Sequence, residues 1–111
     1  MHKPATIFGA LVLCALAGQA HGKPIDEKTV RTFLVACAKE KDECIKDISD
    51  QVMAEDADGS GTACLTDDMR DEPITIYRAM LRWLTGNRKV AAMPPATAIE
   101  TGAKILYPCN P

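Results

Sequence analysis

The side chains best suited to chemistry in this sequence are its cysteines, of which there are five. Four of them follow residue 20: Cys37, Cys44, Cys64 and Cys109. A structural zinc site favours paired C-x-x-C spacings, which these four lack, and thiols in an oxidising compartment pair with one another. We therefore predict two disulfides and no zinc.

Four cysteines allow three pairings, and the sequence leaves all three open. The favoured pairing joins Cys37 to Cys44 and Cys64 to Cys109. Seven residues along one straight helix span ~10 Å, which is beyond disulfide reach, so the first bond requires the helix to break between its cysteines. The second bond would tie the C-terminal tail to the central loop, which stabilises a fold by ~4 kcal/mol in the chain-entropy treatment.

The acidic segment 56–67 follows the register of an EF-hand calcium loop. Its oxygen donors fall at ligand positions of such a loop: Asp56, Asp58, Ser60, the Thr62 carbonyl and Asp67. Gly61 stands at the obligatory sixth position, but the twelfth is Asp67 rather than a bidentate glutamate and the ninth is Cys64. We therefore favour a solvated acidic turn with no metal, and we keep a calcium site as the alternative.

The sequence contains few side chains that could act in catalysis. The two histidines are His2 and His21, both near the N-terminus, so no Cys-His or Ser-His pair can be framed. The carboxylate pairs 67–68 and 71–72 stand in a hydrophilic stretch, where runs of charge are usually solvated. We predict a protein that is not an enzyme and that has no catalytic residue and no cofactor.

The first 20 residues have the pattern of a secretory signal peptide. A start made positive by Lys3 precedes an apolar run at 7–17, and Gly18–Ala20 is a small-x-small cleavage site. A spanning helix needs ~20 apolar residues, and the polar residues from Gln19 onwards end this run too early. We expect cleavage after Ala20, which removes Cys14 and leaves residues 21–111 as one domain in the bacterial periplasm, without a membrane anchor.

The mature chain is small and slightly acidic. Loss of Lys3 leaves 12 of the 13 basic residues against 15 acidic ones, a net charge near −3, and no basic patch suggests nucleic acid. A domain of this size buries only ~60 to 65% of its unfolded surface, so its core is marginal. A domain with such a core is usually stabilised by covalent cross-links, which the predicted disulfides provide.

Apolar periodicity predicts about four short helices. The first begins after Asp26 as its cap, and a charged turn at 38–43 separates it from the second. Their apolar stripes are Val30, Phe33, Leu34 and Cys37, then Ile45, Ile48, Val52 and Met53. Segment 55–61 is a loop, and Pro73 stops any helix that begins at Leu65.

The third helix has the clearest amphipathic pattern: Ile74, Tyr77, Met80, Leu81 and Leu84. Arg78 and Arg82 face outward, Gly86 or Asn87 caps the end, and Trp83 is predicted to cover an edge of the core. The fourth helix opens at Pro94-Pro95 and ends before Pro108. No β-branched run alternates with period two, so the fold class is all-α, a small bundle stapled by two disulfides.

Five short motifs run through the mature chain: Phe33-Leu34-x-x-Cys37, Cys44-Ile45-x-x-Ile48, Cys64-Leu65, Leu81-Arg82-Trp83-Leu84 and Ala103-x-x-Leu106-Tyr107-Pro108-Cys109. Together they resemble the Tai/Rap immunity proteins, which neutralise peptidoglycan amidase effectors delivered by bacterial type VI secretion. The closing Tyr-Pro-Cys is the most telling motif. Two places depart from the family pattern: Asp47 and Asp50 replace an aromatic residue and a glycine, and Thr66 replaces a proline.

The resemblance implies a small, exported, mostly helical protein that is frequently a homodimer. It also implies that part of the surface occludes the catalytic cleft of a secreted cell-wall amidase. We expect the partner to be such an amidase or another periplasmic protein, with loops 55–61 and 86–95 as candidate contact surfaces. The alternative function is that of an exported calcium-binding module.

Overall fold

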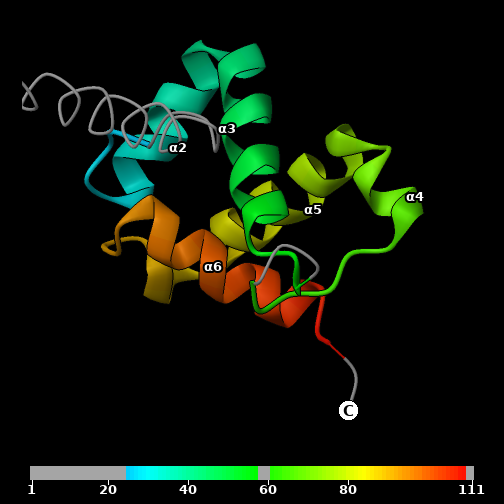
Figure 1. Ribbon diagram of the computed structural model, residues 1–111. Coiled ribbons are helices and arrows are strands. Elements are labelled where there is room, and N and C mark those ends of the chain that lie inside the picture. The colour runs from blue at the N-terminus through cyan, green and yellow to red at the C-terminus, as the bar shows by residue number, and fades with distance from the viewer. Residues whose placement is uncertain (1–24, 58–60, 110–111) are drawn as a thin grey trace, which may run out of the picture.

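The computed structural model describes residues 25–57 and 61–109, so the predicted signal peptide and two predicted loop ligands, Asp58 and Ser60, lie outside the described residues. The helices are α2 (Val30–Lys39), α3 (Lys41–Ala54), α4 (Asp67–Arg70), α5 (Pro73–Gly86), the 3-10 turn η2 (Arg88–Val90) and α6 (Pro95–Leu106). No strand forms within these ranges. The prediction of an all-α fold with two disulfides is confirmed (Figure 1).

The cap of helix α2 lies three residues after the predicted cap, Asp26, so that prediction was wrong. Thr29 is the cap, because its Oγ1 accepts a hydrogen bond from the Thr32 N–H at 3.2 Å and the Thr32 side chain turns back toward the Thr29 N–H. The next two N–H groups of α2 donate to carbonyls of a distant segment, Val30 to Met93 at 2.9 Å and Arg31 to Ala91 at 3.0 Å. These four bonds satisfy the start of α2 better than the exposed Asp26 could.

The charged turn expected at 38–43 is a break of one residue. Helix α2 continues to Lys39 and α3 starts at Lys41, with Glu40 alone outside helical geometry at φ −126° and ψ 73°. Helical hydrogen bonding persists on both sides of the corner: the Glu40 N–H donates to Ala36, and its carbonyl accepts from Cys44. The two Cα atoms of the Cys37–Cys44 disulfide are consequently 5.0 Å apart, as the favoured pairing required.

The single turn α4 was not predicted as a helix. Thr66 caps it, with its Oγ1 accepting from the Met69 N–H at 3.3 Å, and none of its residues is buried. Four residues are too few to display an apolar period, so sequence patterning could not find this element. Pro73 then stands as the first residue of α5, and Asn87 follows its end as predicted.

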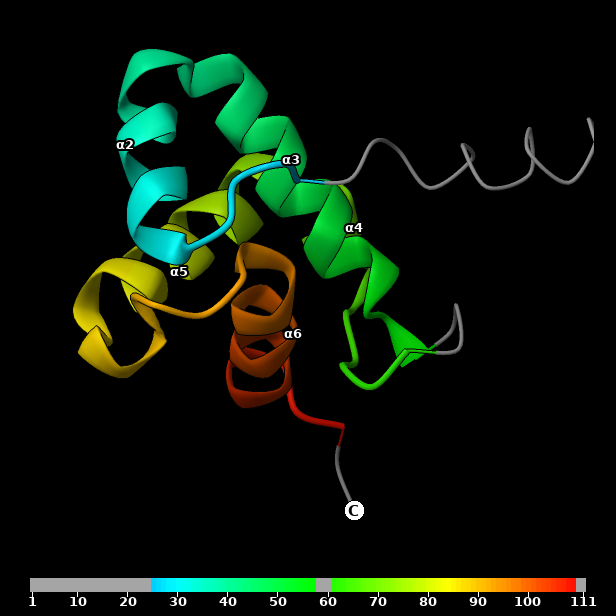
Figure 2. The ribbon, with the colours of Figure 1, turned by 90° about the vertical axis from the view of Figure 1, so that its left-hand side faces the viewer.

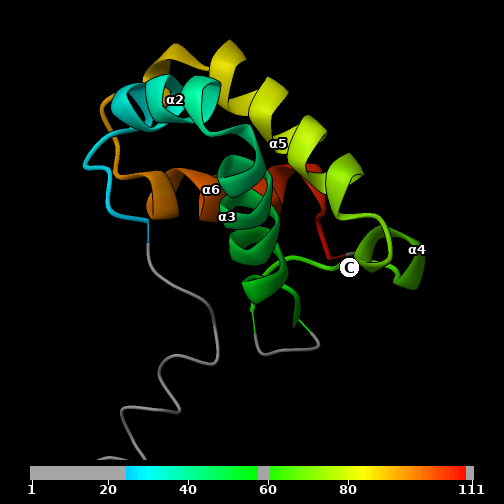
Figure 3. The same cartoon turned by 90° about the horizontal axis from the view of Figure 1, so that it is seen from above.

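The core lies where α3, α5 and α6 meet, with α2 covering one end (Figures 1 and 3). Its largest fully buried side chains are Ile48, Ile76, Met80, Ile99, Val30, Val52 and Pro95. Ile74, predicted in the apolar stripe of α5, is instead 38% exposed, and Ile76 takes its place in the core. Arg78 and Arg82 face outward as predicted, and the half-buried Trp83 packs on the core.

The contact between α5 and α6 depends on Gly102. A Cβ built there would lie 2.7 Å from Trp83 Cε3 and 2.8 Å from Met80 Sδ, closer than real Cβ contacts. Any larger residue would therefore push the two helices apart or displace the indole.

We predict that Gly102→Val destabilises the protein by about 1–3 kcal/mol, the usual cost of overpacking a core. Urea unfolding followed by circular dichroism measures the change in the free energy of unfolding. Gly86→Ala is the matched control, because a Cβ at Gly86 meets nothing within 4 Å and should be neutral or stabilise by up to about 1 kcal/mol. Equal effects of the two substitutions would contradict the proposed close packing.

Candidate functional site

The acidic loop predicted at 55–61 has two legs, residues 55–57 and 61–65, which are cross-linked by backbone hydrogen bonds. The Gly61 N–H donates to the Asp56 carbonyl at 2.9 Å, and the Ala63 N–H donates to the Glu55 carbonyl at 2.7 Å. A Cβ at Gly61 would collide with the Glu55 backbone, so only glycine permits this approach. The first leg continues from the end of α3, and the second leg runs on toward α4 (Figures 2 and 3).

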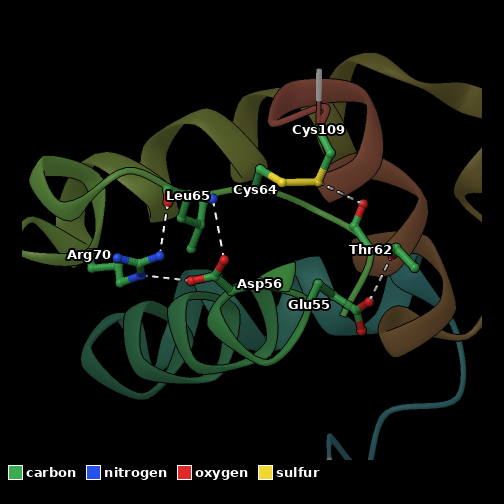
Figure 4. The surroundings of a disulfide bond; sticks show 7 residues. All are labelled: Glu55, Asp56, Thr62, Cys64, Leu65, Arg70 and Cys109. Carbon is green, nitrogen blue, oxygen red and sulfur yellow. Dashed lines mark hydrogen bonds and ion pairs between the residues drawn. A yellow bond between two sulfur atoms is a disulfide. The ribbon is translucent and has the colours of Figure 1, made fainter. Parts of the chain in front are cut away.

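The second leg is attached to the C-terminal tail, a residue range far away in sequence. Cys64 forms a disulfide with Cys109, with Cα atoms 4.9 Å apart, which confirms the second favoured pairing. Beside it the Cys64 N–H donates to the Tyr107 carbonyl at 2.9 Å, and the Cys109 sulfur lies 3.7 Å from the Thr62 carbonyl oxygen (Figure 4). Burial raises the pKa of the Tyr107 phenol from its ordinary value.

The base of the loop is held by a charged cluster around Arg70. The Asp56 side chain is buried, and its Oδ2 accepts from Arg70 Nε at 2.6 Å while its Oδ1 accepts from the Leu65 N–H at 3.4 Å. The same guanidinium donates through Nη2 to the Leu65 carbonyl at 3.0 Å and through Nη1 to Asp67 at 2.6 Å. Figure 4 shows Arg70 reaching from α4 to Asp56 and Leu65.

These contacts bear directly on the calcium alternative. The structure brings together Asp56 and Asp67, the first and last residues of the EF-hand register, but around the guanidinium of Arg70. The Thr62 hydroxyl donates to Glu55 at 3.4 Å, and the Thr62 carbonyl faces the Cys109 sulfur. In the described ranges 25–57 and 61–109, no group of three or more His, Cys, Asp or Glu side chains is arranged to hold a metal ion.

Arg70 was missed by sequence reasoning, although a partial signal exists. Its spacing of three from Asp67 fits an ion pair on a helical turn, but sequence patterning did not show that this turn forms. The contact with Asp56 spans 14 residues, so no local pattern indicates it.

Part of the other predicted contact segment, 86–95, packs against the helical body and hydrogen-bonds to it. The carbonyls of Ala91 and Met93 receive the first N–H groups of α2, and Val90 is buried. Its outer side carries Arg88 and Lys89, both exposed. The backbone of this segment is thus fixed, while two cationic side chains remain accessible.

A shallow cavity of about 230 Å³ lies between the extended residues 25–27 and helices α2 and α3, which sequence reasoning did not predict. Its floor includes Phe33, Ala36 and the Cys37–Cys44 disulfide. Acidic side chains surround it: Asp26, Glu27, Glu40, Glu43 and Asp47. The arrangement favours cations over anions, because the carboxylates share one rim.

The two disulfides indicate an oxidising, extracytoplasmic environment for this protein. Over the part of the chain that the structure describes, no helix has both the length and the apolar character needed to cross a membrane.

Removal of the two disulfides should have unequal effects. The Cys64–Cys109 bond joins residues 45 apart and the Cys37–Cys44 bond joins residues seven apart. In the chain-entropy treatment, Cys64→Ser with Cys109→Ser should cost about 4 kcal/mol and Cys37→Ser with Cys44→Ser about 2.5 kcal/mol. Equilibrium urea unfolding of both double variants tests this ranking, and the reverse order would refute it.

Arg70→Met should destabilise the fold by about 3–5 kcal/mol, because it leaves the Asp56 carboxylate buried without its guanidinium. Asp56→Asn in that background should recover part of the loss, since it removes the unpaired charge. Asp67→Asn is the control: Asp67 is 93% exposed, and such surface pairs contribute about 0–1 kcal/mol. Thermal and urea unfolding give the comparison, and a loss for Asp67→Asn as large as for Arg70→Met would exclude this assignment.

No protein-family model, no curated protein and no solved structure matches this chain. The description of the fold and of the anchored loop therefore relies on the structure of this chain. The likeness to Tai/Rap immunity proteins rests on the short motifs alone.

Proposed function

We propose that this protein is a periplasmic immunity-like protein that binds a type VI secretion peptidoglycan amidase effector and occludes its catalytic cleft. One observation carries the proposal: the two described legs of the acidic segment, 55–57 and 61–65, are held in place by a disulfide to residue 109, by an ion pair and by backbone hydrogen bonds. A segment that enters a cleft binds more tightly when the chain on either side of it is already ordered.

Pre-organisation of its two legs gives this segment an energetic advantage. Ordering a flexible segment on binding costs about 0.5–1.5 kcal/mol for each immobilised side chain, and a loop that is rigid beforehand avoids that cost. The Cys64–Cys109 bond and the Asp56–Arg70 pair hold the second leg and the first leg respectively. Their arrangement therefore supports inhibition by insertion rather than by a broad flat contact.

The cellular location in this proposal follows from two facts of different kinds. Residues 1–20 have the composition of a signal peptide, and the disulfides require an oxidising compartment. An immunity protein against a cell-wall hydrolase must meet its target where the wall is, which in a Gram-negative cell is the periplasm. The binding of a protein, with no catalysis and no cofactor, is the role that we assign to it.

The direct test uses the mature chain and purified exported cell-wall amidases, including any that is encoded beside its gene. Titration calorimetry should show a stoichiometric complex, and the hydrolase should lose its ability to clear a peptidoglycan suspension when the chain is added. Absence of both binding and inhibition with every such hydrolase would overturn the proposal.

The role of the loop is tested by Thr62→Arg, which adds bulk to an exposed position on its second leg. We expect a loss of at least about 2 kcal/mol in binding free energy, the threshold of an interface hot spot, with no change in melting temperature. Thr101→Arg is the matched control, because Thr101 is an exposed threonine on α6. If both variants bind and inhibit as the unmodified chain does, the loop is not the inserting segment.

A further inference from the structure

Charge is strongly segregated along this chain. Residues 40–72 hold twelve acidic and three basic side chains, whereas residues 73–99 hold four basic side chains and no acidic one. The four are Arg78, Arg82, Arg88 and Lys89. A protein with negative net charge therefore carries one continuous stretch of purely positive charge, on α5 and η2.

The four cations are exposed and have no internal partner. Arg78 and Arg82 stand one turn apart on the outward side of α5, and Arg88 and Lys89 follow directly in η2. Within the described ranges, no ion pair or hydrogen bond engages the charged group of any of them, whereas Lys46, Arg70 and Lys104 are all paired.

Stabilisation of α5 does not explain this arrangement. Cations favour a helix when they lie in its last turn, beside the unpaired carbonyls. The last turn of α5 contains no basic residue, since Arg78 and Arg82 precede it and Arg88 follows it. The helix would also form without them, because its buried face supplies the packing that holds it.

We propose that this cationic face, formed by Arg78, Arg82, Arg88 and Lys89, is a docking surface for an acidic face of a partner protein. Three of the four cations are arginines, whose planar guanidinium groups bind carboxylates through two parallel hydrogen bonds. Complementary charge of this kind accelerates and orients encounter more than it tightens the final complex. The proposal assigns a contact separate from the loop that inserts, and it holds whether or not the partner is an amidase.

A protein partner fits better than a lipid surface. A helix that lies on a membrane inserts its apolar face, and the apolar face of α5 is buried in the core. Ile74 is the one large apolar side chain of α5 that is exposed, and it is only 38% accessible. The abundant acidic residues elsewhere on the chain would also repel an anionic bilayer.

The first test uses a hexaglutamate peptide as probe, added to the isotope-labelled mature chain at low ionic strength. Amide shifts in the NMR spectrum should concentrate between residues 78 and 89. Arg78→Glu with Arg82→Glu should weaken peptide binding at least fivefold. Lys28→Glu with Lys41→Glu makes the same change in net charge at other exposed positions and should leave binding within twofold. Shifts located elsewhere, or equal losses in both double variants, would overturn the proposal.

Folding of each variant is checked by melting temperature, and Arg88→Glu with Lys89→Glu provides a second pair should the first one unfold. Vesicles containing phosphatidylglycerol supply the lipid arm. If the chain sediments with these vesicles through the same arginines and shows no shift with hexaglutamate, the surface belongs to a membrane and the proposal fails.

The hydrolase complex gives an independent measurement. The association rate constant at low salt should fall about tenfold for the Arg78 and Arg82 pair and much less for the lysine pair, with a weaker salt dependence. A hydrolase that binds with unchanged association rate in both variants would refute the docking surface while leaving loop insertion intact. If no hydrolase binds at all, the proposed function fails, and the peptide result still decides the cationic face.

Discussion

The buried carboxylate of Asp56 is the constraint on which the functional end of this molecule depends. A charge removed from water requires a partner, and the Arg70 guanidinium, 2.6 Å away, supplies a compensating charge. Arg70 in turn requires the single turn α4, which has no buried residue to stabilise it. The pairing of Asp56 with Arg70 thereby holds three segments together: the end of α3, the second leg of the loop, and α4, which precedes α5.

The disulfide between Cys64 and Cys109 complements that ion pair. The ion pair is local to the loop and α4, whereas the disulfide fastens the loop to the end of the chain, beyond α6. A small domain buries little apolar surface, so packing alone gives such a segment limited support. Covalent and ionic restraints therefore add to packing at this end, where Ala63 and Leu65 join the apolar core that α3, α5 and α6 form.

The surface divides into parts with different chemistry. The anchored loop is acidic, the shallow cavity beside the Cys37–Cys44 disulfide has an acidic rim, and the outward side of α5 and η2 is cationic. Insertion of the loop and attraction at the cationic face would act at different stages of one encounter. The first determines how firmly a bound partner is held, and the second determines how fast and in which orientation it arrives.

The sequence by itself determined the helical class, the apolar faces and the need for two disulfides, because helix periodicity and cysteine parity are local or countable properties. It also indicated the outward arginines of α5. Only the tertiary structure decided that Thr29 rather than Asp26 starts α2, since the carbonyls that complete that cap come from residues 91 and 93. It likewise showed that Glu40 is the only residue between α2 and α3. It also placed the Arg70 guanidinium between Asp56 and Asp67, the first and last residues of the EF-hand register. Those features depend on which distant groups meet in space, and no spacing along the chain encodes that.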